Sequence, residues 1–219
     1  MKKSIIFFCV VSLFGVAGIA DADPFQNGSF ELPSPPAPIL GSSTYSFGSE
    51  VPFPVIPWTL GAGAVSWVGT GWQAAEGSSS IGLSFSSFLS AAGSLSQTFD
   101  TVAGTLYEVT FALAGNPNAA AAAVDPIKDL RVSAAGISED FTFDVSGKNT
   151  TNMGWTDFSF PFLATADLTT LSFTSLENNA FGPAIDNVRV NVVPEPATLL
   201  LLGAGLTGLA FFGRKKFVN

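Results

Sequence analysis

The chain has 219 residues, of which 12% are charged, and its formal net charge is −8. This length suits one domain with a core of its own, and the acidic balance argues against nucleic acid as a partner, because phosphate binding needs clustered Lys and Arg. The sequence has no histidine and a single cysteine, Cys9, which excludes Ser-His-Asp and Cys-His catalysis as well as zinc sites built on His or Cys.

Residues 1–22 have the pattern of a secretory signal peptide. Two lysines near the start precede an apolar segment at residues 5–16, which we expect to form the signal helix. Ala20 and Ala22 then provide an A-x-A site, so we expect signal peptidase to cleave after Ala22. A short N-terminal membrane anchor is the alternative interpretation.

Residues 23–193 show the alternation of apolar and polar side chains that is typical of β-strands, and no sustained helical periodicity. The clearest alternating segments are residues 107–113, 141–145, 158–162 and 188–192. Further expected strands are residues 64–68, 79–85, 94–99, 127–133 and 169–175. Because each segment offers one apolar face to a core, the sequence predicts an all-β sandwich.

Two segments of this domain are expected to be loops. Residues 33–57 contain seven prolines, which are poorly tolerated in central strands. Residues 115–126 hold an alanine run between Pro117 and Pro126, and this run is too short to be a stable helix alone.

The C-terminal segment, residues 194–219, has three parts in a fixed order. Pro194, Glu195 and Pro196 come first, an apolar span at residues 197–212 follows, and the basic residues are Arg214, Lys215 and Lys216. As a helix the apolar span would be roughly 24 Å long, and flanking basic side chains can extend its reach in a bilayer. We expect a transmembrane helix with its basic end in the cytoplasm and the domain outside.

This order of parts resembles the PEP-CTERM sorting signal. The resemblance implies that an exosortase in the inner membrane cuts near the Pro-Glu-Pro motif, so that the exported protein is anchored transiently and then released or attached at the cell surface. It also implies a Gram-negative bacterium that makes exopolysaccharide. An ordinary tail anchor is the alternative.

The domain resembles the choice-of-anchor C family through four motifs in order. They are Asn27 to Glu31, Trp72 to Gly77 with Ser80 to Leu83, Leu95 to Phe111, and Gly182 to Val188. This family is similar to the galactose-binding-like jelly rolls of many carbohydrate-binding modules, so the resemblance implies a jelly-roll β-sandwich. Gly82 stands where the pattern favours an acidic residue.

Two carboxylates are candidates for a structural calcium site. Glu31 follows the first motif and Asp186 precedes the last expected strand, and the first and last strands of a jelly roll can be neighbours. Two adjacent carboxylates repel unless a cation lies between them, and calcium prefers oxygen ligands. Asn27 and Asp100 could add oxygens. Alternatively, Glu31 and Asp186 cap turns or pair with Arg189 and Lys128.

Aromatic side chains are candidates for glycan binding, because sugar rings stack on Trp and Tyr. Tyr45 and Trp58 lie in or beside the proline-rich segment, so we expect them to be the exposed pair. Trp72 and Trp155 are expected in the core. For each of these residues core packing stays open as the alternative.

These features favour an exported, non-catalytic glycan-binding module that acts on exopolysaccharide or biofilm matrix. A structural matrix or surface protein without sugar specificity is the second interpretation. A polysaccharide-acting enzyme is the third, although nothing in the sequence selects the two carboxylates that glycoside hydrolysis needs.

Overall fold

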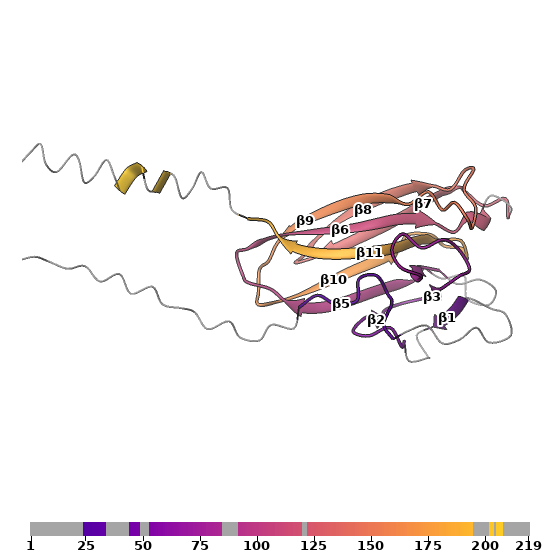
Figure 1. The fold of residues 1–219 in the computed structure, drawn as a ribbon, viewed down its shortest axis with the longest axis horizontal. Coiled ribbons are helices and arrows are strands. Elements are labelled where there is room, and N and C mark those ends of the chain that lie inside the picture. The colour runs from indigo at the N-terminus through magenta and orange to yellow at the C-terminus, as the bar shows by residue number, and fades with distance from the viewer. Residues whose placement is uncertain are drawn as a thin grey trace, which may run out of the picture.

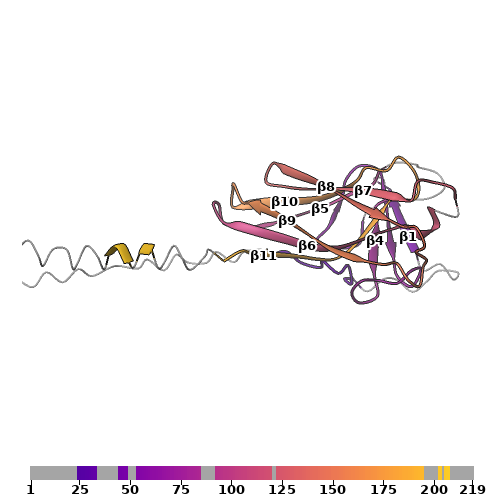
Figure 2. The same ribbon diagram turned by 90° about the horizontal axis from the view of Figure 1, so that it is seen from above.

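The computed structural model describes residues 24–33, 44–48, 53–84, 92–119, 122–194, 202–203 and 205–207. Its body consists of two antiparallel β-sheets packed face to face (Figure 1). Figure 2 shows the two layers from above, with β6 and β11 in one and β8 and β10 in the other.

The larger sheet has six strands in the order β1-β3-β4-β11-β6-β9. Their bounds are Thr44–Gly48 for β1, Ala64–Val68 for β3, Ser80–Gly82 for β4, Pro183–Val192 for β11, Leu106–Gly115 for β6 and Thr156–Leu163 for β9. The smaller sheet has the order β2-β5-β10-β7-β8. Its bounds are Thr59–Leu60 for β2, Ser94–Asp100 for β5, Leu168–Ser175 for β10, Ile127–Ala134 for β7 and Ile137–Asp144 for β8.

Successive strands alternate between the sheets from β4 to β7 and again from β8 to β11, with a hairpin between β7 and β8. This repeated crossing gives the jelly-roll connectivity, so the expected all-β sandwich is confirmed. Every long alternating segment of the sequence became a strand because its apolar face lies against the opposite sheet.

Aromatic rings fill the space between the sheets. Phe111 of β6 lies at the centre, with ring centroids 5.2 Å from Phe141 of β8 and 5.4 Å from Phe173 of β10. Trp67, Phe160 and Phe162 are also fully buried. Because the only cysteine of the chain lies before this domain, burial of these apolar side chains carries its stability.

The proline-rich segment differs from the expectation of a loop, since it contributes the edge strand β1 and precedes β2. The five residues of β1 contain no proline, and they pair with β3 from Thr44 opposite Val68 to Gly48 opposite Ala64. The alanine-rich segment contains one 3-10 turn, Pro117–Ala119, as its only described helical element.

The expected signal helix at residues 1–22 lies outside the described residues. Beyond Pro194, only residues 202–203 and 205–207 are described, and they are helical. No helix within the described part of the chain has the length and apolarity needed to cross a membrane.

Candidate functional site

Two carboxylates hold residues 73–79, which lead into β4 and are here called the wall loop. Glu31 fixes its second half: Oε1 accepts hydrogen bonds from the backbone N–H groups of Ser78 (2.8 Å) and Ser79 (2.7 Å). The Ser78 hydroxyl donates to Oε2 of the same carboxylate at 2.8 Å. Glu31 therefore caps the turn that leads into β4.

Asp186 fixes the first half of the wall loop from beneath. Its Oδ2 accepts hydrogen bonds from the backbone N–H groups of Ala75 (2.7 Å) and Glu76 (2.9 Å). Its Oδ1 accepts a third bond from the N–H of Asn187 at 2.6 Å. The side chain is fully buried, at 0% exposure, so the loop and the sheet are joined through a carboxylate that water does not reach.

Burial raises the pKa of the Asp186 carboxyl to about 7, and the nearby charge of Glu31 adds to this rise. The backbone N–H groups of Glu76, Asn187 and Ala75 act in the opposite direction, because they favour the charged form. Loss of hydration outweighs them, so this group titrates near neutral pH.

Hydrogen-bond donors surround the carboxylates of Glu31 and Asp186. Each carboxylate accepts three hydrogen bonds from N–H or O–H groups. The positive partial charge of these donors opposes a cation beside the same oxygens. Among the described residues, no group of three or more acidic side chains gathers. The contacts favour the alternative of turn capping, while the calcium hypothesis itself stays a prediction.

The two other residues considered for calcium serve elsewhere. The Asn27 amide donates to the carbonyls of Leu32 (2.6 Å) and Ile56 (2.7 Å) and accepts from the Leu32 N–H, so it holds two loops together. Asp100 ends β5 opposite Leu168, in the other sheet from Asp186. The structure does not bring Asp100 to the wall loop.

The basic partners that the sequence offered to Glu31 and Asp186 also lie elsewhere. Arg189 donates to Glu76 at 3.1 Å, and Lys128 pairs with Glu177 at 3.4 Å.

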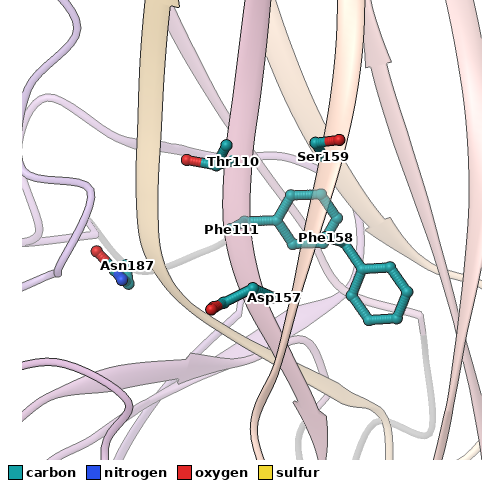
Figure 3. A pocket seen from close by; sticks show the side chains of 6 residues that line it. All are labelled: Thr110, Phe111, Asp157, Phe158, Ser159 and Asn187. Atoms are coloured by element: carbon teal, nitrogen blue, oxygen red, sulfur yellow. The ribbon is translucent and has the colours of Figure 1, made fainter.

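A groove lies beside the wall loop on the outer face of the six-stranded sheet. One hollow of about 360 Å³ is lined by Thr110, Asp157, Ser159 and Asn187 (Figure 3). Phe111 and Phe158 also border it, although their rings pack against Phe141 of the opposite sheet. A second of about 380 Å³ is lined by Gln73, Ala74, Ala75, Asn152, Gly154, Trp155, Asp157 and Asn187. Because both hollows share Asp157 and Asn187, they form one groove that crosses β11, β6 and β9.

Strand register explains why polar side chains meet in this groove. Thr110 on β6 is opposite Ser159 on β9. Both residues lie on the outer face of the sheet, because the neighbouring inward positions of each strand are more buried. The ladder between β11 and β6 is irregular between Asp186 and Arg189, and Asn187 there has a φ of 50°. This bulge re-aims Asn187 into the groove.

Trp155 forms part of the far side of the groove. Its indole N–H donates to the backbone carbonyl of Gln73 at 2.8 Å, and the Gln73 N–H donates to Thr150. The ring is partly buried and packs against the core, as Trp72 does. Trp155 therefore packs against the core as expected, but it also lines the groove, which was not expected.

The expected exposure of Trp58 is wrong. Its side chain is 3% exposed, its indole N–H donates to the Asn27 carbonyl, and its ring contacts Phe25, Phe30 and Phe173. The chain returns to the core after the proline-rich segment, so the core-packing alternative holds for Trp58. Tyr45 lies in β1 opposite Trp67, and its side chain lies outside what the structure describes.

Sequence reasoning missed Asp157, Asn187 and Trp155 as groove residues. Asn187 follows Asp186 within the Gly182 to Val188 motif. A polar residue that interrupts an apolar run in a strand can indicate a bulge, and this was the signal available in the sequence. No pattern indicated that the wall loop would fold against residues 152–155.

The family model described as "Protein of unknown function (DUF642)" matches residues 23–191. The chain belongs to the DUF642 family. A search of curated proteins gave no match to this DUF642 chain.

The PEP-CTERM protein-sorting motif matches residues 192–216, directly after the DUF642 domain. The resemblance of the C-terminal segment to this signal is therefore confirmed. The motif marks an exported protein that is held at the membrane and processed by an exosortase.

Among solved structures, the DUF642 chain is similar to a family 35 carbohydrate-binding module from Clostridium thermocellum, with 13% identity, a TM-score of 0.41 and coverage of 69% of this chain and 100% of that one. It is also similar to "TmCBM61", solved with β-1,4-galactotriose, with 17% identity, a TM-score of 0.41 and coverage of 63% and 90%. A family 16 carbohydrate-binding module gives 14% identity, a TM-score of 0.39 and coverage of 58% and 84%. These likenesses concern the fold alone.

Proposed function

We propose that the exported domain binds glycan without transforming it, and that the groove between the wall loop and β9 is the binding site. The observation that carries the proposal is the groove itself: an open polar hollow on a rigid sheet, with a partly buried tryptophan in its lining. The natural ligand in this proposal is exopolysaccharide or biofilm matrix outside the cell.

The lining suits sugar hydroxyl groups. Thr110 and Ser159 both donate and accept hydrogen bonds, Asp157 accepts, and Asn187 offers an amide. Trp155 supplies an aromatic surface next to them. Since the polar groups lie on three paired strands, their spacing is fixed before the ligand arrives, which lowers the entropy cost of binding.

The groove supports binding better than hydrolysis. Glycoside hydrolysis needs two carboxyl groups that flank the scissile bond. Asp157 is the one carboxylate among the residues that line the two described hollows. Asp186 lies close in sequence to Asn187, but it is fully buried and bonded to the wall loop.

A structural matrix or surface protein without sugar specificity is the second candidate function. A structural protein would need the same export and sorting signals as a binding module. It would act by assembling with other copies of the domain, without any ligand. It predicts self-association of the protein and no saturable binding of any glycan.

Paired substitutions in the full-length chain test the site. Asp157→Ala should lower glycan retention about tenfold in affinity electrophoresis and Ser159→Ala about fivefold, since each removes a polar contact from the groove and a hydrogen bond to a charged group is the stronger. Their melting temperatures should stay near that of the wild type, because both side chains are exposed. Glu139→Ala, an exposed acid on β8 in the other sheet, is the matched control and should retain binding. Equal retention by all three variants would remove the groove from the proposal.

A further inference from the structure

Lys128 is a cation placed inside the sandwich. It belongs to the inward row of β7 together with Leu130 and Val132, and its exposure is 0%. Gly115 of β6 makes room for it, since a Cβ there would lie 2.7 Å from Lys128 Cγ. Burial of an ammonium group is costly unless its charge is well compensated.

The compensation that Lys128 receives is small. Within the described part of the chain, its Nζ has one partner, Glu177 Oε2, at 3.4 Å. An ammonium carries three donors, and this single contact is at the long end of hydrogen-bond distances. A purely structural role would favour an apolar side chain of similar size at this position.

Asn179 shares the same carboxylate oxygen. Its Nδ2 donates to Glu177 Oε2 at 2.9 Å, so one oxygen contacts both the lysine amine and the asparagine amide. The other end of the asparagine amide, Oδ1, accepts a hydrogen bond from the Phe181 N–H at 2.8 Å. Glu177 is itself fixed, because its Oε1 accepts the N–H of Asp129.

We propose that Lys128 and Asn179 form an intramolecular isopeptide bond, with Glu177 as the general acid and base. The amine and the amide both contact the carboxylate that would exchange protons between them. One oxygen of the Glu177 carboxylate contacts both nitrogens. The Phe181 N–H, which donates to the asparagine oxygen, would stabilise negative charge on that oxygen as the carbonyl is attacked.

The reaction balances without any further reagent. The Lys128 ammonium gives one proton to Glu177, and the neutral Nζ attacks Cγ of Asn179. The Nζ–Cγ bond forms, the Cγ–Nδ2 bond breaks, and Glu177 delivers the proton to the departing nitrogen. The second proton of Nζ leaves with it, so the products are a secondary amide and ammonium, and Glu177 ends as a carboxylate.

The product would join β7 to the connection between β10 and β11. The domain has no cysteine for a disulfide, and a covalent cross-link restricts the unfolded chain in the same way that a disulfide does. The bond would also remove the buried charge of Lys128, which resolves the cost of its placement.

Mass spectrometry of the purified full-length chain tests this proposal. The wild type should weigh less than its sequence by the mass of one ammonia molecule. After trypsin digestion, the peptides that contain residues 128 and 179 should stay joined, with no cleavage after Lys128. The variants Lys128→Met and Asn179→Ala should keep the full mass, and Glu177→Gln should keep it or lose ammonia far more slowly. Lys148→Met, at the other lysine of the domain, should lose ammonia as the wild type does.

Two outcomes would overturn the bond. The first is a wild-type chain with its full sequence mass and normal cleavage after Lys128. The second is loss of ammonia with the two peptides separate, because a cyclic imide at Asn178 or Asn179 gives the same mass change without a cross-link.

Discussion

Asp186 joins the wall loop to the sheet beneath the groove. Two of its three hydrogen bonds come from backbone N–H groups of the wall loop, and the third comes from the N–H of Asn187 in β11. The bulge that follows it turns Asn187 toward the groove. A single buried carboxylate thus positions two parts of the proposed glycan site.

Stability should depend on pH through Asp186. Its folded pKa of about 7 lies above the ordinary value of 3.8, so between these values the folded state holds a proton that the unfolded state lacks. The stabilising effect of that proton is complete below pH about 4 and disappears as the pH rises through 7. It amounts to at most about 4 kcal/mol.

Denaturant unfolding of the wild type and Asp186→Asn across this pH range measures the effect. Asparagine does not titrate, so the difference in unfolding free energy between the two proteins should change with pH. A constant difference from pH about 4 to about 8 would contradict the raised pKa.

The Glu31 and Asp186 contacts also carry a prediction about calcium. Because N–H and O–H donors already satisfy both carboxylates, we expect EDTA to leave the melting temperature of the full-length chain unchanged. Glu31→Gln should lower it, since one oxygen that accepts hydrogen bonds becomes a donor. A fall in melting temperature with EDTA that added calcium reverses would restore the calcium site, because a ligand bound by the folded state raises stability.

At this scale the sequence identified the importance of Glu31 and Asp186 but not their partners. Motif order placed both at the ends of the domain, where a jelly roll brings strands together. Their hydrogen-bond donors belong to a loop whose course depends on tertiary contacts, so no local pattern could reveal them. Trp58 was misjudged for the same reason, since nearby prolines say little about where a ring packs.

The wall loop, as an element, depends on glycine at position 77. Gly77 has a φ of +65°, and a Cβ there would lie 2.5 Å from Glu31 Oε1. Gly104 has a similar φ of +82° but nothing within 4 Å of its Cβ position. Both alanine variants should lose about 1 kcal/mol from the backbone conformation alone.

Gly77→Ala should lose more stability than Gly104→Ala, because it also displaces the Glu31 carboxylate from Ser78 and Ser79. Chemical denaturation of both variants measures this, and glycan retention should fall only for Gly77→Ala. Equal losses of stability would show that the contact between Glu31 and the wall loop contributes little.

Long strands were predictable because alternation and burial coincide in them. β7 and β10 are examples, since their buried residues alternate with more exposed ones at a period of two. The short edge strands β1 and β2 were not predictable. They have five and two residues, and they exist because β3 and β5 offer open edges for pairing.

On the scale of the whole molecule, β11 connects the groove to the sorting segment. Asn187 lies in the groove, and β11 ends at Val192, where the PEP-CTERM motif begins (Figure 1). Along an extended strand this separation is roughly 17 Å. The groove is therefore set back from the end of the sandwich that is tethered before exosortase processing.

We expect this separation to leave the groove accessible before cleavage. Uncleaved and exosortase-processed protein should bind the same glycan with affinities within about threefold of each other, a difference of less than 1 kcal/mol. Parallel titrations of the two forms measure this. Binding by the processed form alone would mean that the sorting segment or the membrane covers the groove.

The most direct measurement is a titration of the purified full-length chain against a glycan panel that includes exopolysaccharide from a producing strain. Glycan binding by the domain predicts saturable binding that is selective among the sugars, is weakened about tenfold in Asp157→Ala and is unchanged in Glu139→Ala. Absence of binding to every glycan, together with concentration-dependent self-association, would contradict it and favour the structural matrix protein.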